Sequence, residues 1–105
     1  MPWLAATRDG VVASTEFSLY IVRCADGTLY TGIATDVDRR LAEHESGLRG
    51  AKFLRGKGPL KLEFSALLGD RGTAQQFEYR VKKLQRDRKE ALIAGRCTLA
   101  ELAPG

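Results

Sequence analysis

A hairpin between residues 17 and 33 constrains the fold more than any other feature of the chain. Residues 17–24 and 28–33 are rich in β-branched and aromatic residues, which is typical of strands. The residues that join them, Cys24 to Gly27, include the turn-forming pair Asp-Gly. The sequence therefore predicts two antiparallel strands joined by a tight turn.

The type of turn decides which side chains share a face of the sheet. A two-residue Asp-Gly loop would place Tyr20 and Tyr30 on opposite faces. A type I turn in which Gly27 takes a positive φ as a bulge would instead pair Val22 with Tyr30. Because side chains alternate along a strand, Tyr20, Val22 and Tyr30 would then share one face. We favour the bulged turn.

A helix is predicted directly after the hairpin. Thr35 is the expected N-cap, and Gly47 and Gly50 are expected to end the helix. Its apolar stripe consists of Val37, Leu41 and Leu48. Arg40 and His44, one helical turn apart, are expected on one face beside this stripe.

The second half of the chain predicts a third strand and a longer helix. Residues 60–68 alternate in part between apolar and polar side chains, which favours a strand. Thr73 and Gln76 form a capping box for a helix that runs to about Arg86. The expected core face of this helix is Ala74, Phe77, Val81 and Leu84. Shorter helical segments are expected at 51–55, 89–94 and 98–101.

A chain of 105 residues has the length of one domain. We expect a loosely ordered N-terminal arm at 1–15, the folded domain at 16–96, and a helical turn and tail at 97–105. No apolar run has the length of a membrane span, and the N-terminus lacks the pattern of a signal peptide. These features predict a cytoplasmic location. Cys24 and Cys97 are expected to be buried thiols.

The basic residues fall into two clusters. The chain has 17 Lys and Arg against 13 Asp and Glu, a net charge of +4. One cluster contains Arg49, Lys52, Arg55, Lys57 and Lys61. The other contains Arg80, Lys82, Lys83, Arg86, Arg88 and Lys89. A two-part basic surface favours an anionic polymer such as nucleic acid, and solvated helix faces are an equal alternative on charge alone.

Five positions together carry a family resemblance. Tyr20, the Tyr30-Thr31-Gly32 motif, Arg40 and His44 have a spacing that resembles the GIY-YIG nuclease superfamily, over residues 17–93. The segments CADGTLYTGIATDVDRRLAEH and EYRVKKL are similar to small single-domain bacterial members. Those members are related to the nuclease domain of the eukaryotic endonuclease that cuts branched DNA.

The resemblance implies an α+β fold with a small three-stranded antiparallel sheet flanked by helices. It also implies hydrolysis of phosphodiesters with one divalent ion, Mg²⁺ or Mn²⁺. Tyr30 matches the tyrosine that orients or deprotonates the attacking water, and Tyr20 would lie beside it. Arg40 matches the family arginine. Glu78 lies on the later helix, where the family has its metal-binding glutamate.

Two further positions have less defined roles. His44 matches a histidine found in part of the superfamily, and both a catalytic and an orienting role are open. Gly32 would allow close backbone approach before the helix.

The sequence departs from the family pattern at two points. Ile33 stands where some members have a lysine beside the second tyrosine, and the chain contains no asparagine, which other members use.

The chemistry of these residue types agrees with the resemblance. An arginine presents a planar, permanently charged fork to phosphate. Mg²⁺ keeps several waters and takes one or two carboxylates, so one glutamate is adequate. Tyrosine is a poor base at pH 7 unless cations depress its pKa, and Arg40 and a bound metal would be such cations. The alternatives are half-buried strand tyrosines, an ion pair of Arg40 with Asp36, and one of Glu78 with Lys82.

The preferred hypothesis is a metal-dependent endonuclease acting on DNA in repair or recombination. Single-stranded or branched DNA is favoured, and RNA is an alternative substrate. The residues expected to contact the nucleic acid are Lys52, Arg55, Lys57, Lys61, Lys82, Lys83 and Arg86. The other hypotheses are an inactive nucleic-acid-binding module and a partner-dependent subunit that docks through exposed Leu99 and Leu102 or through the N-terminal arm. A homodimer is also open, and no membrane contact is expected.

Overall fold

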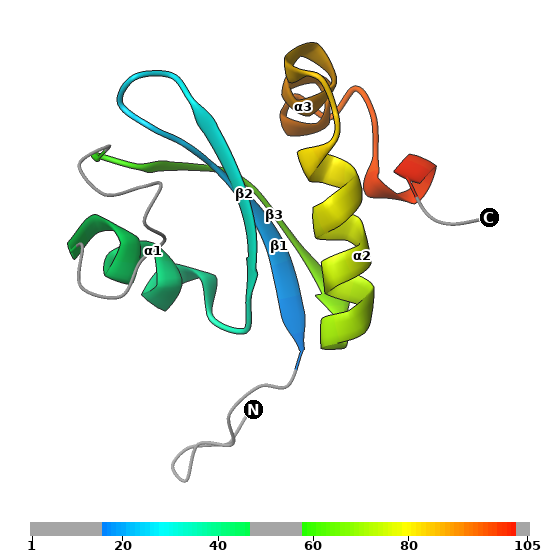
Figure 1. Ribbon diagram of the computed structural model, residues 1–105, viewed down its shortest axis with the longest axis horizontal. Coiled ribbons are helices and arrows are strands. Elements are labelled where there is room, and N and C mark those ends of the chain that lie inside the picture. Colours follow the sequence, from blue (N-terminus) through cyan, green and yellow to red (C-terminus); the bar gives the residue numbers. More distant parts are fainter. Residues whose placement is uncertain (1–15, 47–57, 103–105) are drawn as a thin grey trace, which may run out of the picture.

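The fold is a small antiparallel sheet between two helical layers (Figure 1). The computed structural model describes residues 16–46 and 58–102. Its elements are β1 (Phe17–Arg23), β2 (Leu29–Ala34), α1 (Val37–Ser46), β3 (Lys61–Gly69), α2 (Arg71–Lys82), α3 (Arg86–Ile93) and the 3₁₀ helix η2 (Leu99–Leu102). The strand order is β2–β1–β3, and both pairs are antiparallel. The predicted α+β class and three-stranded sheet are confirmed.

The hairpin turn has the predicted bulged form. Val22 lies opposite Tyr30, and Gly27 has φ 89°. The Gly27 amide donates to the Cys24 carbonyl at 2.9 Å, and the Cys24 amide donates to the Thr28 carbonyl at 2.8 Å. Glycine adopts this φ without a steric penalty from a side chain. The turn therefore fixes the register that puts both tyrosines on one face.

The central strand β1 separates two apolar clusters. Tyr20 and Val22 face α1, where Val37 and Leu41 pack against them. Leu19 and Ile21 face the opposite side and pack with α2 and α3. The predicted core face of α2 is confirmed, because Ala74 and Val81 are buried and Phe77 and Leu84 pack on the same cluster. One strand thus contributes to both faces of the core.

The predicted N-caps of the two longer helices are wrong. Asp36, not Thr35, caps α1, and its carboxylate accepts from the Arg39 amide at 3.1 Å. Asp70 caps α2 and accepts from the Thr73 amide at 2.8 Å, so Thr73 lies inside the first turn. In both cases a carboxylate is available just before the helix. Its charge also interacts favourably with the helix dipole.

The predicted boundary between α2 and α3 is also wrong. The helix expected to reach Arg86 ends at Lys82. The Lys83 amide bonds to the Arg80 carbonyl and the Leu84 amide to the Val81 carbonyl, which tightens the last turn. α3 follows an extended residue, Gln85. The final helical turn is confirmed, since the Thr98 amide donates to Glu101 at 2.9 Å before η2.

Several predictions fall outside the described residues. They concern the arm at 1–15, the helix at 51–55, the apolar contact of Leu48 and the tail at 103–105. Within the described part, Cys24 is buried but Cys97 is only partly buried, and neither forms a disulfide. Leu99 and Leu102 pack against the core and are not exposed as predicted. None of the described helices is long and apolar enough to span a membrane.

Candidate active site

Tyr20 is the centre of the candidate site. It lies on β1, and only 1% of its surface is exposed. Its hydroxyl is 2.9 Å from Nε2 of His44, a buried residue of α1. Tyr30 on β2 completes a triangle of rings, with its centroid 6.4 Å from Tyr20 and 5.7 Å from His44. Residues from three elements therefore converge on the α1 face of the sheet.

Gly32 makes room for the Tyr20 ring. The two residues lie directly opposite one another in the β1–β2 ladder. A Cβ atom at Gly32 would lie 2.5 Å from the Tyr20 hydroxyl and 2.7 Å from Cζ. Real Cβ atoms essentially never approach a neighbour this closely. Glycine is therefore required at position 32 because the Tyr20 ring occupies the space of a side chain. The φ angle of Gly32 is ordinary and does not itself require glycine.

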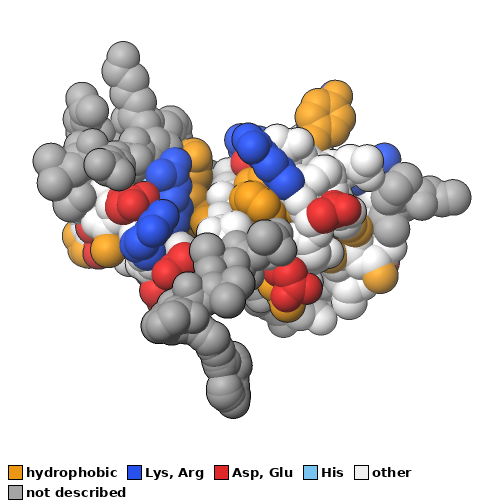
Figure 2. Space-filling model, turned by 90° about the horizontal axis from the view of Figure 1, so that it is seen from below, with side chains coloured by type: hydrophobic (Ala, Val, Ile, Leu, Met, Phe, Trp, Pro, Cys, Tyr) orange, Lys and Arg blue, Asp and Glu red, His pale blue; other side chains and the backbone are white. Residues whose placement is uncertain are grey.

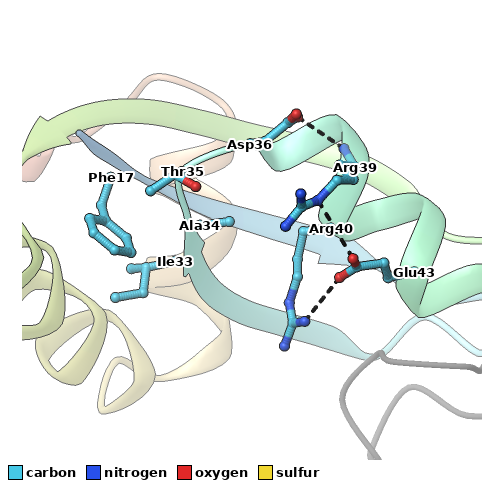
Figure 3. A pocket seen from close by; sticks show the side chains of 8 residues that line it. All are labelled: Phe17, Ile33, Ala34, Thr35, Asp36, Arg39, Arg40 and Glu43. Atoms are coloured by element: carbon cyan, nitrogen blue, oxygen red, sulfur yellow. Dashed lines mark hydrogen bonds and ion pairs between the residues drawn. The ribbon is translucent and has the colours of Figure 1, made fainter. Parts of the chain in front are cut away.

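Arg40 points from α1 toward the edge strand β2 (Figure 3). Its Nη1 lies 3.1 Å from Glu43 Oε1, and the other carboxylate oxygen lies 3.6 Å from Nε of Arg39. Asp36, the alternative partner of Arg40, instead accepts from the Arg39 amide as a helix cap. Glu43 thus holds two guanidinium groups on one face of α1. Sequence reasoning missed Glu43, although its spacing from Arg39 and Arg40 is the signal for such pairs.

Helix α2 contributes Glu78 and Lys82. The Lys82 ammonium lies 3.4 Å from Glu78 Oε2 and 6.0 Å from the centroid of the Tyr30 ring. The Glu78 carboxylate is close enough to Tyr20 to raise the pKa of its hydroxyl. Lys82 therefore supplies a cation beside Tyr30, where position 33 has an isoleucine. This contact results from the packing of α2 against β2 and could not be predicted from the sequence.

Burial determines the protonation of the Tyr20–His44 pair. Burial raises the pKa of Tyr20 to about 12, Tyr30 adds to the rise, and the Arg40 charge opposes it. Burial and the Arg40 charge both lower the pKa of His44. At neutral pH both groups are therefore uncharged, and with the imidazole proton on Nδ1 the hydroxyl donates to Nε2. For Tyr20, burial outweighs the charge of Arg40, so the net effect is a raised pKa.

We expect Tyr20 to lose its proton only at high pH. Its folded pKa of about 12 exceeds the value of about 10 for an unfolded chain. The stability that this group contributes is therefore complete below about pH 10 and is lost as the pH rises toward 12. Phenolate absorbance, measured after a pH jump and before the protein unfolds, will show one component that titrates near pH 12. Tyr20→Phe will lack it, and its presence in that variant would contradict the assignment.

The donor set near Glu78 fits a hard cation that keeps most of its waters. Among residues 16–46 and 58–102, no three His, Cys, Asp or Glu side chains form a metal-binding group. A fully protein-enclosed metal site is therefore not built from these residues. Mg²⁺ is typically bound through one or two carboxylates together with water and substrate oxygens. The single carboxylate of Glu78 suits this mode of binding.

The predicted nucleic-acid contacts lie in several places. Lys82 and Lys83 are at the end of α2, whereas Lys61 begins β3, which the central strand separates from β2. Figure 2 shows Lys and Arg side chains in two groups on one face of the molecule, with acidic side chains near both. The remaining predicted contacts, Lys52, Arg55 and Lys57, lie outside the described residues.

Arg86 is bonded within the protein. Its Nη2 donates to the Gly27 carbonyl at 2.8 Å, and its Nε donates to Glu90 at 3.0 Å. Glu90 also accepts two hydrogen bonds from Arg23, at 2.7 and 2.9 Å. These bonds tie the hairpin turn and β1 to α3. They give Arg86 a structural role, and its contact with nucleic acid stays a prediction.

The class of this protein is shown by the family that its sequence matches. Residues 16–91 match the GIY-YIG catalytic domain, and the chain belongs to this family. The family implies chemistry on nucleic-acid phosphodiesters. The resemblance of the sequence to the GIY-YIG superfamily is thereby confirmed.

Close relatives carry the name UPF0213. The chain is 56% identical over 88 residues to UPF0213 protein YhbQ of Escherichia coli, covering 84% of this chain and 87% of YhbQ. The NMR structure of UPF0213 protein BH0048 from Bacillus halodurans is 43% identical, covers 77% of this chain and 85% of its own, and gives a TM-score of 0.51. The NMR structure of EF2693 from E. faecalis is 31% identical, covers 88% of this chain and 93% of its own, and gives a TM-score of 0.56.

Proposed function

We propose that this protein is a metal-dependent endonuclease that hydrolyses phosphodiester bonds in DNA. The observation that carries the proposal is the convergence of Tyr20, Tyr30 and His44 beside Arg40 and Glu78. In-line cleavage of a phosphodiester needs an activated water and neutralisation of the charge on the phosphoryl oxygens. This arrangement contains a group suited to each task.

Tyr30 is the residue that activates the water in this proposal. It is only partly buried and lies next to the Lys82 ammonium. That cation would stabilise negative charge that develops near Tyr30. Tyr20 remains protonated, because its pKa is about 12, and acts as a hydrogen-bond donor. We propose that His44 accepts this bond and orients Tyr20.

Arg40 and Glu78 act on the phosphate. The Arg40 side chain is 38% exposed, so its guanidinium can bind an incoming phosphoryl group while Glu43 fixes its position. Glu78 would hold a Mg²⁺ or Mn²⁺ ion, which stabilises charge on the phosphate and the leaving oxygen when bound. Lys82 must then release Glu78 or share it with the ion.

We propose single-stranded or branched DNA as the substrate, in repair or recombination, with RNA as an alternative. The described domain contains no separate module that would read sequence. Exposed Lys82 and Lys83 would contact the backbone, so binding is expected to weaken steeply with salt.

The decisive experiment compares wild type with Tyr30→Phe and Glu78→Gln. Labelled single-stranded, duplex and branched DNA and single-stranded RNA are incubated with Mg²⁺, Mn²⁺ or EDTA. We expect metal-dependent cutting by wild type, and a loss of about 10²–10⁴-fold in Tyr30→Phe if that group transfers the proton. Glu78→Gln is expected to lose the metal-dependent cutting.

Matched variants control for general damage. Tyr79→Phe changes an exposed tyrosine of α2, and Asp87→Asn changes an exposed carboxylate of α3, so both are expected to cut like wild type. Cutting that persists in Tyr30→Phe and Glu78→Gln would contradict the proposal. Cutting that is absent from wild type under all conditions would also contradict it.

One observation favours an inactive binding module as the second candidate. Glu78 is paired with Lys82 at 3.4 Å, which is the arrangement expected of a solvated helix face. In such a module the carboxylate would have no metal to hold. Salt-sensitive binding without turnover, even with enzyme in excess, would support this candidate.

A further inference from the structure

A hollow lies beside Arg40, across the edge strand β2. It is lined by Phe17, Ile33, Ala34, Thr35, Asp36, Arg39, Arg40 and Glu43. Figure 3 shows Phe17 and Ile33 together on one side and the two arginines with Glu43 on the side of α1. The hollow therefore has an apolar wall with an aromatic ring and a wall with two guanidinium groups.

The size of the hollow bears on what it can hold. Its volume is about 230 Å³. Pockets that enclose a whole small molecule have volumes of roughly 300–1,000 Å³. This hollow is smaller, so it suits one part of a longer ligand better than a free small molecule.

The two walls match the two chemical parts of a nucleotide. Aromatic side chains bind unpaired bases by stacking, with little dependence on sequence. Guanidinium groups bind phosphate through a planar fork of donors. Arg39 is suited to this contact because its side chain is 74% exposed, and Glu43 restrains its guanidinium at 3.6 Å. A base on Phe17 and a phosphate on Arg39 would occupy both walls at once.

We infer that this hollow binds the unpaired nucleotide next to the phosphodiester that is cleaved. Arg40 lines the hollow, and its charge also opposes the rise in the pKa of Tyr20. The hollow is therefore continuous with the candidate active site. The inference rests on the proposed function and adds a subsite to it. A paired base cannot stack on a protein side chain without leaving its duplex, so this subsite favours single-stranded DNA.

The test measures binding without cleavage. Fluorescence anisotropy in EDTA compares oligothymidine with an abasic oligomer of the same length, which has the same phosphates and no bases. Wild type is expected to bind oligothymidine about tenfold more tightly, as expected for stacking of a base. Phe17→Leu will lose most of this difference and leave binding of the abasic oligomer unchanged. Arg39→Ala will weaken binding of both oligomers and reduce the salt slope by about one ion.

Control variants change the same residue types elsewhere. Tyr79→Leu removes an exposed aromatic ring of α2, and Arg96→Ala removes an exposed arginine after α3. Tyr79→Leu is expected to keep the difference between the oligomers, and Arg96→Ala to keep the salt slope. A melting curve for each variant verifies its fold.

A second measurement reads the subsite directly and does not depend on Phe17→Leu being folded. Phe17→Trp in a Trp3→Phe background puts the only tryptophan into the hollow. Oligothymidine is expected to quench its fluorescence, and the abasic oligomer is not. Equal quenching by both, or a base preference unchanged in Phe17→Leu, would overturn the subsite alone. A wild type that binds neither oligomer would also overturn the subsite, and the cleavage assay with branched DNA and RNA then decides the proposed function separately.

Discussion

Replacing Gly32 with alanine is expected to lower the melting temperature by about 10 °C and to abolish most cleavage. The new Cβ would lie 2.5 Å from the Tyr20 hydroxyl and 2.7 Å from Cζ, so the buried ring must move. Overpacking of this kind costs about 2 kcal/mol, and 1 kcal/mol corresponds to about 4–8 °C in a domain of this size. The ring would also lose its hydrogen bond to His44. Thermal melts and cleavage rates measure both effects.

Two further variants isolate the cause of this effect. Gly72→Ala is the matched control, because a Cβ there would meet only Asp70 Oδ1 at 3.8 Å, and alanine in a helix is expected to raise stability slightly. Tyr20→Phe removes the atom in closest contact. Combined with Gly32→Ala, it should cost less stability than the sum of the two single changes. Additive losses would contradict the contact.

Replacing Arg40 with lysine is expected to reduce kcat by about 10²–10³-fold, the effect of removing one oriented donor from a transition state. Lysine keeps the positive charge but lacks the planar fork. Binding of DNA in EDTA should change little, because one charge is exchanged for another. Single-turnover cleavage and anisotropy separate the two effects.

Arg96→Lys is the control for this exchange, since Arg96 is exposed and lies outside the hollow. It should leave both kcat and binding unchanged. A kcat for Arg40→Lys close to wild type would show that Arg40 contributes charge alone. That result would contradict its proposed contact with the phosphoryl group.

The parts of the site that local rules determine could be predicted from the sequence. The shared face of Tyr20 and Tyr30 follows from the period of a strand and the bulge at Gly27. The common face of Arg40 and His44 follows from helical periodicity. Neither inference needs knowledge of how elements pack together. The buried bond between Tyr20 and His44 then results from α1 covering that face.

The errors arose where two local candidates compete. Thr35 and Thr73 have the chemistry of N-caps, yet Asp36 and Asp70 perform this function. Both types of residue are favoured at N-caps, so sequence alone did not separate neighbouring candidates. The helix boundaries moved with the caps.

Contacts between elements could not be predicted from local patterns. The position of Lys82 beside Tyr30 depends on how α2 packs on β2, which no spacing rule determines. The protonation of Tyr20 depends on its burial, which outweighs the nearby charge of Arg40. Both facts concern the tertiary environment of residues that the sequence analysis had named as candidates.

The position of Tyr20 on the central strand determines which parts of the site can adapt to a substrate. β1 is paired on both sides along its length, so Tyr20 cannot shift without disrupting two ladders of hydrogen bonds. Arg40, Glu78 and Lys82 are on helices and have long side chains with exposed surface. Adjustment to a bound substrate therefore occurs in the helical side chains. The Tyr20 hydroxyl stays fixed, and a bound nucleic-acid strand is aligned against it.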